Sequence, residues 1–376
     1  MSLSKRARRI WIFFIGFGLI LGIGALWLNQ QLEPVKLTNT VLGKIGKELN
    51  LKFEFEGLPS YAMKPEPRLI LPNLKVINPI DNQVFLSAKR VEISLPWSTI
   101  LGDTPHITRI EADDPVLDFK GLKAWQSTRP AAPFEVPTFT SGLEINNGQF
   151  VGDGYTIDKI MLLLPHLEDQ QPVEADISGV FLQGKTMFSF DGPLNVEKAG
   201  LNSEFTLDSK GELDFGDKPL QYQIKTAGHF ASLEKSFDLK LKTLGLASES
   251  PLPNVQAILN LSFGDLLKID SRGTISEWPK DWPTLPAPLN KHTKNIPYQL
   301  NYAGKPDFSD ALNLKLDVAK NKFSSTIKIA EIQSWMDQGD GSPLPPLHGQ
   351  FEIPLIQLDG VSLEGVSIEI TPDDNP

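Results

Sequence analysis

The chain of 376 residues contains no cysteine. This absence excludes disulfide frameworks, thiolate metal sites and cysteine nucleophiles, and it fits an oxidising compartment such as a bacterial periplasm. Histidine is scarce as well. No two of the five histidines stand at metal-ligand spacing and no H-E-x-x-H occurs, so we predict no metal site. The histidines are His106, His166, His229, His292 and His348.

Catalytic and cofactor motifs are missing too. The chain has no G-x-S-x-G elbow, no Walker-type loop and no dinucleotide fingerprint. The Asp113-Asp114-Pro115 segment is typical of a turn, and residues 337–341 resemble a calcium loop without its closing glutamate. We therefore predict a protein that is not an enzyme, with no catalytic residue, metal or cofactor. An exported hydrolase stays open only if folding brings distant carboxylates or a histidine together in a cleft.

An excess of positive charge is found only at the very start of the chain. The net charge is -10, and setting aside the four basic residues of the leader leaves -14 for the remainder. Such an acidic body argues against nucleic-acid binding and against a second, electrostatic hold on anionic lipid. The leader residues that we expect to set membrane topology are Lys5, Arg6, Arg8 and Arg9.

Residues 10–28 have no charged or amide side chain. As a helix rising about 1.5 Å per residue they would span roughly 28 Å, close to the thickness of a bilayer core. We predict a single transmembrane helix with the leader 1–9 in the cytoplasm and the body outside, which places the protein in a bacterial inner membrane with its C-terminal body in the periplasm. The residues assigned to this anchor are Trp11, Phe13, Phe14, Gly18, Leu21, Gly22 and Trp27.

Two other interpretations of residues 10–28 were weighed. A cleaved signal peptide would end in small residues, whereas bulky Leu26, Trp27 and Leu28 follow the nearest small-x-small pattern here. A buried core helix would be shorter and less uniformly apolar. Gly18 and Gly22 form a G-x-x-x-G pair, a weak signal for a transmembrane dimer that leaves the oligomeric state undefined.

A short helix is expected after the anchor, beginning at Pro34, because apolar residues recur with helical spacing up to Leu49. Its opposite side carries Lys36, Lys44 and Lys47. The apolar side either lies on the outer headgroup surface or packs on the first strands of the body. We favour packing, because the helix is short and not strongly basic.

From Leu51 onward the apolar residues recur with period two, which predicts strands that each have one apolar and one polar side. Turn signals such as Asn147-Gly148 and Asp359-Gly360 separate these runs. The predicted fold is mainly β, with an antiparallel sheet forming the body. The apolar strand positions, predicted to face lipid or a core, are Phe53, Phe55, Val91, Ile93, Leu95, Phe237, Leu239, Leu241, Leu312, Leu314, Leu316 and Val318.

Proline-rich stretches interrupt the strand pattern. Residues 129–141 are predicted to be a linker between an N-terminal region, 29–128, and a C-terminal β-rich region, 142–376. Residues 278–297 hold five prolines and are predicted not to form a central strand. The body is then either a sandwich whose apolar faces pack together or a curved sheet whose apolar concave face receives acyl chains.

The whole arrangement resembles the AsmA family of Gram-negative envelope proteins: a basic start, one inner-membrane helix, a short helix and a β-rich periplasmic body. The resemblance is carried by residues 67–79 (PRLILPNLKVINP), 86–95 (LSAKRVEISL) and 107–119 (ITRIEADDPVLDF). Residues 143–150 (LEINNGQF) are similar to the strand that opens the family's later domain.

The resemblance implies outer-membrane biogenesis or lipid homeostasis, with a lipid-binding β-groove and no catalytic motif. The expected partners are membrane lipid and, in addition, envelope assembly proteins. The alternative is a structural or assembly factor of the envelope that acts through protein contacts at sheet edges.

Overall fold

The computed structural model describes residues 34–62, 66–96, 106–129, 135–184, 186–214, 219–233, 236–282, 292–306, 308–329, 331, 348–358 and 361–371. Its contacts divide the chain into two compact units. Unit 1 comprises Met1–Ala131 and Phe139–Asp153, and unit 2 comprises Ala132–Thr138 and Gly154–Pro376. The expected anchor, residues 10–28, and the basic leader lie outside the described residues.

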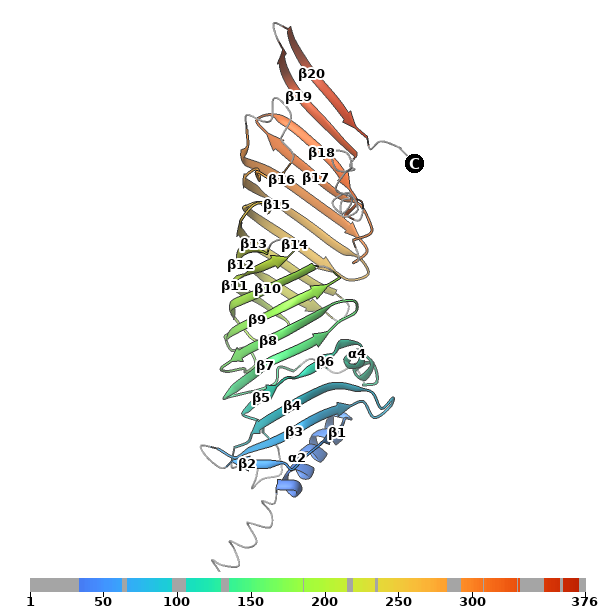
Figure 1. The fold of residues 1–376 in the computed structure, drawn as a ribbon, viewed down its shortest axis with the longest axis vertical. Coiled ribbons are helices and arrows are strands. Elements are labelled where there is room, and N and C mark those ends of the chain that lie inside the picture. The colour runs from blue at the N-terminus through green and yellow to red at the C-terminus, as the bar shows by residue number, and fades with distance from the viewer. Residues whose placement is uncertain are drawn as a thin grey trace, which may run out of the picture. The chain divides into compact units, whose positions relative to one another are not determined.

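Unit 1 is a small mixed sheet with two helices (Figure 1). β3 pairs antiparallel with β1, β2 and β4, and β4 pairs antiparallel with β5 and β6. β5 and β6 then pair in parallel with β7. The elements are α2 (Pro34–Leu49), β1 (Lys52–Phe55), β2 (Ser60–Ala62), β3 (Arg68–Ile77), β4 (Val84–Ser94), β5 (Arg109–Asp113), β6 (Val116–Asp118), α4 (Phe119–Ser127) and β7 (Gly142–Val151).

The core of unit 1 lies between one face of this sheet and the two helices. Leu42 of α2 is buried in it, and the ring of Trp125 in α4 stacks on Phe85 of β4 at a centroid distance of 5.7 Å. The Trp125 indole also donates a hydrogen bond of 3.2 Å to the Leu49 carbonyl, where α2 ends. The apolar side of α2 therefore packs on the first strands, as favoured from the sequence.

Helix α4 was not predicted. Asp118 caps its N-terminus, because the Asp118 carboxylate accepts hydrogen bonds from the backbone N–H groups of Lys120 and Gly121. Gly121 lets the helix approach the sheet, since a Cβ at that position would stand 2.6 Å from the Cβ of Phe85. The connection through α4 also gives the chain the length that it needs to bring β7 parallel to β5 and β6.

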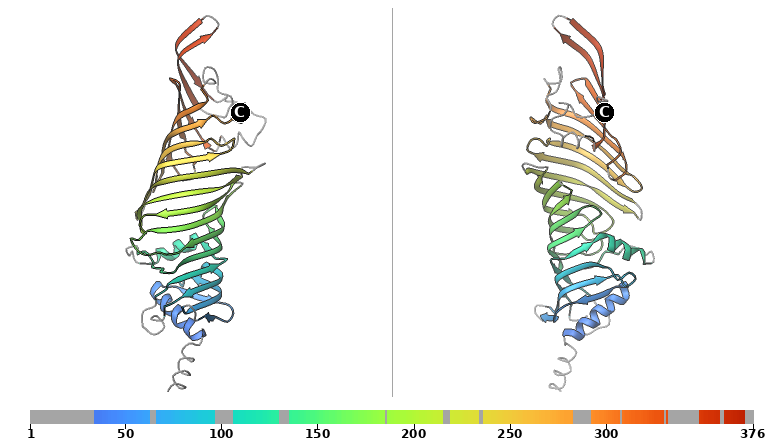
Figure 2. Two further views of the ribbon diagram at one scale, coloured as in Figure 1. Left: turned by 90° about the vertical axis from the view of Figure 1, so that its left-hand side faces the viewer. Right: turned by 45° about the vertical axis from the view of Figure 1, so that its right-hand side comes forward.

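Unit 2 is an antiparallel meander in which each strand pairs with the next one along the chain (Figures 1 and 2). Figure 2 shows the twist of its strands from two further sides. The strands are β8 (Thr156–Leu164), β9 (Val173–Gln183), β10 (Thr186–Val196), β11 (Asn202–Asp214), β12 (Leu220–Leu233), β13 (Ser236–Ser248), β14 (Val255–Phe263), β15 (Leu267–Glu277), β16 (Lys294–Gly304), β17 (Leu312–Val318), β18 (Asn321–Ile327), β19 (His348–Leu358) and β20 (Val361–Ile370).

The mainly β prediction is confirmed, but three details differ from the sequence-based expectation. The sheet of unit 1 contains parallel pairs. The contact-based boundary falls at Asp153, so β7 belongs to unit 1, whereas the sequence placed a linker at 129–141. Pro297 lies inside β16, so the exclusion of 278–297 from strands was wrong at its end. The proline is tolerated because β16 pairs with β17 only from Tyr298 onward. At Pro297 there is therefore no hydrogen bond to β17 that the missing N–H would have to donate.

Candidate functional site: the apolar face of the unit 2 sheet

Apolar side chains of unit 2 share one face of the sheet, and their cross-strand registers align them into continuous rows. We call this face, from β9 to β18, the apolar face. One row crosses the sheet through Phe230, Leu239, Leu261, Ile269, Tyr302, Leu312 and Ile327. A second row runs through Ile224, Leu246, Val255, Ile275 and Ile296.

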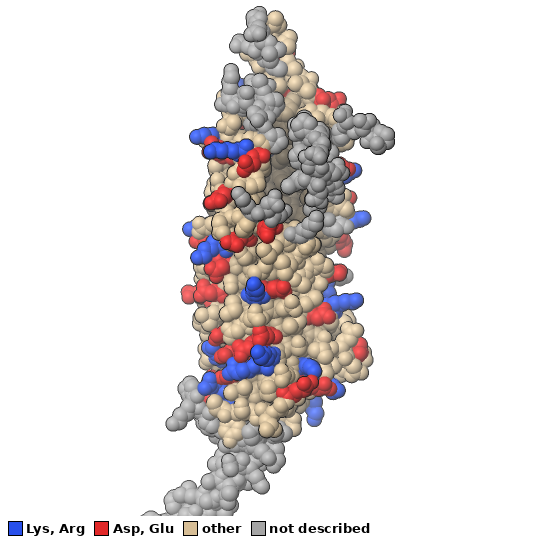
Figure 3. Space-filling model, in the orientation of Figure 1, with Lys and Arg blue, Asp and Glu red and all other residues tan. Residues whose placement is uncertain are grey.

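Among the described strand positions of the apolar face, charged side chains occur only where Glu277 pairs with Lys294, at the last register position of β15 and β16. The opposite face of the same strands is polar. It carries ion pairs such as Lys225 with Asp208 at 3.0 Å and Lys242 with Glu204 at 2.8 Å. In the space-filling view, many Lys, Arg, Asp and Glu side chains project along the margins of the visible face, and several others lie between the margins (Figure 3).

Most side chains of the apolar face are half-buried, whereas most of those on the polar face are exposed. This difference is informative because the described strands of unit 2 have extensive contacts only with their neighbours in the sheet. Among the described elements, no second sheet or helix packs against the apolar face. The partial burial therefore comes from neighbouring side chains in the same sheet.

Towards its C-terminal end the apolar face is packed more tightly. Ile296 and Ile353 are almost fully buried there, and the rings of Phe323 and Phe351 lie 4.8 Å apart. Trp278 contributes to the same cluster from the connection after β15. The side chains of the apolar face are therefore half-buried in β9–β14 and form a more deeply buried cluster in β15–β19.

Two tyrosines on the apolar face stand opposite glycines, and one of them reaches across its glycine to the next strand. Tyr222 of β12 stands directly opposite Gly211 of β11, and its hydroxyl passes over the glycine to donate a 2.8 Å hydrogen bond to the Ser189 carbonyl in β10. Burial raises the pKa of Tyr222, so its hydroxyl stays protonated and able to donate. Tyr298 of β16 also stands opposite a glycine, Gly273 of β15, but its hydroxyl bonds the Ser271 hydroxyl of that same adjacent strand at 3.0 Å.

These glycines are required by close backbone approach. A Cβ at Gly211 would stand 1.8 Å from the Ser189 carbonyl oxygen, and one at Gly192, where φ is +155°, would stand 2.0 Å from the Asp208 carbonyl oxygen. Both glycines fall in gaps in the β10–β11 register. The β12–β13 and β13–β14 pairs contain bulges or register shifts as well. Glycine kinks and bulges of this kind bend strands and curve a sheet.

Two further hydroxyls on the apolar face are hydrogen-bonded to the backbone. The Thr226 hydroxyl donates a 2.7 Å hydrogen bond to the Thr243 carbonyl at the β12–β13 bulge, and the Ser325 hydroxyl donates to the His348 carbonyl at 3.0 Å. Because these hydroxyls are already bonded, they do not add a polar patch to the apolar rows.

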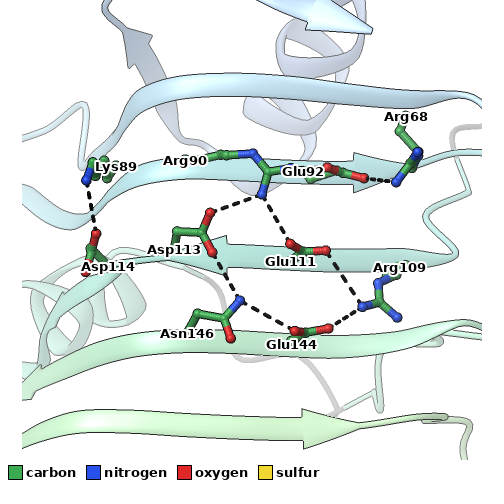
Figure 4. Close-up of polar contacts among 10 residues, drawn as sticks. All are labelled: Arg68, Lys89, Arg90, Glu92, Arg109, Glu111, Asp113, Asp114, Glu144 and Asn146. Atoms are coloured by element: carbon green, nitrogen blue, oxygen red, sulfur yellow. Dashed lines mark hydrogen bonds and ion pairs between the residues drawn. The ribbon is translucent and has the colours of Figure 1, made fainter. Parts of the chain in front are cut away.

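Unit 1 carries a different surface, an ion-pair ladder on the sheet face opposite its core (Figure 4). Glu92, the most buried member, pairs with Arg90 and, at 2.6 Å, with Arg68. Arg90 reaches Glu111 at 3.1 Å and Asp113 at 3.0 Å. Partial burial works against the charge of Arg90, yet the hydrogen bonds to Asp113 and Glu111 raise its pKa overall.

The ladder continues to β7, where Arg109 pairs with Glu144 and Asn146 donates to Asp113 at 3.1 Å. Its three arginines and four carboxylates are engaged with one another across β3, β4, β5 and β7. Such mutual pairing holds neighbouring strands together, and it leaves little charge directed toward a ligand.

The strand residues singled out from the sequence separate into two groups. Those in unit 1 pack in its closed core with Leu42: Phe53, Phe55, Val91, Ile93 and Leu95. Those in unit 2 share the apolar face: Phe237, Leu239, Leu241, Leu312, Leu314, Leu316 and Val318. Sequence reasoning missed the tyrosine–glycine pairs, because they depend on register between strands.

No group of three or more His, Asp or Glu side chains suited to a metal occurs in the described part of the chain. His229 and Lys242 both approach Glu204, at 3.5 Å and 2.8 Å, on the polar face. The hydrogen bond from Lys242 is the main reason why the pKa of Glu204 is lowered. This cluster is exposed and its charges are paired.

Within the described ranges, no helix is both long enough and apolar enough to cross a membrane. Comparisons of the chain with models of known protein families, with characterised proteins and with solved structures found no match.

Proposed function

We propose that this chain is an AsmA-like, membrane-anchored periplasmic protein of outer-membrane biogenesis or lipid homeostasis. In this proposal, residues 10–28 hold it in the inner membrane and the apolar face of unit 2 binds or passes phospholipid. It acts without catalysis or a cofactor. The observation that carries the proposal is the set of uncharged apolar rows that cross β12–β18 without a second described layer over them.

The chemistry of such a face matches acyl chains. Each methylene moved from water onto an apolar surface contributes about 0.8 kcal/mol, before the costs of association are subtracted. Row positions repeat from strand to strand, as at Leu239, Leu261 and Ile269, so a chain shifted by one strand meets an equivalent surface. Because an acyl chain has a similar binding energy at successive positions, it should move along the apolar face and not stay bound at one position.

Lipid handling requires the sheet to be curved, with the apolar face on the inside of a groove. The half-burial of the apolar face, the exposure of the polar face and the glycine kinks at Gly192 and Gly211 all support bending toward the apolar side. In such a groove the acyl chains lie inside and the headgroups stay at the rim, in water. A closed sandwich would leave no room for them.

A structural or assembly factor of the envelope is the second candidate. The outer edge of β20 is its supporting observation, because β20 pairs only with β19 among the described strands and Val361 and Leu363 are exposed on it. An unpaired edge of this length offers a template for a strand from a partner protein.

Native mass spectrometry of the full chain, extracted with its membrane anchor, tests the proposal. We expect phospholipid adducts to survive release from the detergent micelle. If the spectrum shows only the polypeptide without lipid, and crosslinking in cells recovers a protein partner, the lipid-handling proposal is rejected in favour of the assembly role.

A further inference from the structure

One long edge of the unit 2 sheet exposes large apolar side chains at successive hairpins, whereas the described residues of the other edge, between β9 and β18, expose only Met187. This edge carries the turns that follow β10, β12, β14 and β16, and we call its apolar residues the lip. In chain order they are Leu201, Leu233, Phe237, Phe263, Leu266 and Phe308.

The lip is continuous in space. The backbone N–H of Ser232 bonds the Leu201 carbonyl at 2.7 Å, which joins the first two hairpins. Phe237 and Phe263 are direct cross-strand partners. At the far end, the ring of Phe308 lies 5.2 Å from Tyr302, a member of the apolar rows.

The lip meets the apolar face at Phe237 and Phe263, whereas Leu233 points to the polar face. Phe237 and Phe263 point to the same side as Leu239 and Leu261, two residues further in along the same strands. Their exposed fractions, 36% and 45%, mean that the apolar surface reaches solvent at this edge.

The opposite edge is different. Between β9 and β18, its described residues expose one large apolar side chain, Met187, which points to the polar face beside Asp214. The apolar residues in its described turns, Leu252, Trp278 and Trp282, are half-buried, and the exposed positions are polar, charged or proline residues, among them Glu249, Lys280 and Lys320. The two edges therefore differ in what can cross them: a charged rim opposes the passage of methylene groups, and an apolar one does not.

From this asymmetry we propose that acyl chains of phospholipid enter and leave the apolar face sideways, across the lip, instead of only at the ends of the sheet. This inference rests on the proposed lipid-handling function. The lip offers methylene groups an apolar contact before they reach the half-buried rows, so the barrier to loading is lowest there. The charged headgroup remains outside in water throughout.

Loading kinetics test the proposal. The full chain, reconstituted with its anchor, is mixed with vesicles of phosphatidylethanolamine and phosphatidylglycerol that contain a phospholipid fluorescent on its acyl chain. The double variant Phe263→Asp with Leu266→Asp places two charges on the lip. We expect its initial loading rate to fall about tenfold or more, because each charge must be desolvated as methylenes pass, while the lipid held at equilibrium changes little.

The matched control is Ile258→Asp, because Ile258 lies on the same strand β14, is 47% exposed and points to the polar face. It should load at the wild-type rate. The single variant Leu266→Asp, in a turn and 47% exposed, provides a lip substitution with little risk to folding and should show a smaller decrease.

Equal rates in the lip variant and the control would overturn lateral entry while leaving lipid handling intact. Loss of a bound protein from the lip variant, with loading unchanged, would also overturn it and make the lip a protein-docking edge. A wild-type chain that takes up no lipid would instead remove the function on which the inference depends.

Discussion

The hydroxyl of Tyr222 in β12 donates a hydrogen bond to the carbonyl of Ser189 in β10, across the intervening strand β11. It can do so only because the residue between them, Gly211, has no side chain. One contact thus ties three strands together at a point where the β10–β11 register lapses. Tyr298 also faces a glycine, Gly273, but its hydroxyl bonds Ser271 in the adjacent strand, so the contact across a third strand is made at Tyr222.

Removing the hydroxyl tests this relationship. We expect Tyr222→Phe to lower the free energy of unfolding of unit 2 by about 1 kcal/mol, because the Ser189 carbonyl loses its donor in a half-buried place. Chemical denaturation followed by circular dichroism measures it. Tyr61→Phe in unit 1 is the control. An equal loss of unfolding free energy in that variant would show that the Tyr222 hydrogen bond does not stabilise the sheet.

The same hydroxyl gives a pH dependence. Burial raises the pKa of Tyr222 above its ordinary value of 10.0 in the folded chain. Its contribution to stability is therefore complete below the pKa of an unfolded tyrosine, and it is lost as pH rises through the folded pKa. Unfolding midpoints should fall with pH above about 10. Tyr222→Phe should flatten that part of the profile, and an unchanged profile would contradict the assignment.

Gly211 should tolerate no side chain. We expect Gly211→Ala to destabilise unit 2 by several kcal/mol or to prevent its folding, because the new Cβ would overlap the Ser189 carbonyl oxygen at 1.8 Å. The control is Gly43→Ala in α2, where a Cβ meets nothing within 4 Å. That variant should be as stable as the wild type, or more stable by up to about 1 kcal/mol, because alanine favours a helix. Thermal melting of both variants decides the matter.

The ladder of unit 1 predicts a large effect from one carboxylate. Glu92→Ala should destabilise unit 1 by about 1–3 kcal/mol, since it removes the most buried carboxylate of the ladder, which Arg68 and Arg90 share. Glu54, which pairs with Lys52 on the surface with both side chains about half exposed, is the control. Glu54→Ala should cost less than about 1 kcal/mol. Equal losses of unfolding free energy in the two variants would mean that the burial of Glu92 does not increase its contribution to stability.

A charge in the middle of the apolar face should abolish lipid binding. Leu259 lies between Leu241 and Ser271 in the rows, and its neighbour Ile258 points to the polar face. We expect Leu259→Glu to reduce the phospholipid recovered with the purified chain about tenfold or more, because an acyl chain would have to desolvate the carboxylate. Ile258→Glu should retain lipid. Circular dichroism spectra should establish that both variants keep their strand content.

Period-two alternation made much of unit 2 predictable. Leu312, Leu314 and Leu316 alternate with polar residues and fall in β17, whose bounds match the expected run. A strand's own sequence records which side is apolar, so the division of residues between two faces was predictable. The helix from Pro34 was predictable for the same reason, through its longer period.

Features that depend on distant residues were not predictable. The parallel pairing of β5 with β7 and the crossing of Tyr222 over Gly211 both require knowledge of register between strands. Helix α4 has only nine residues, so its three large apolar side chains, Phe119, Leu122 and Trp125, were too few to distinguish a helix from a turn. The exposure of the lip depends on which turns share an edge, and that follows only from the meander as a whole.

Site-specific photocrosslinking in cells tests the central claim most directly. A photoreactive amino acid replaces either Leu239, in the apolar rows, or the adjacent Lys240, on the polar face, in the full chain. The account predicts that position 239 captures phospholipid and that position 240 does not. Capture of protein alone at position 239, or equal capture of lipid at both positions, would contradict it.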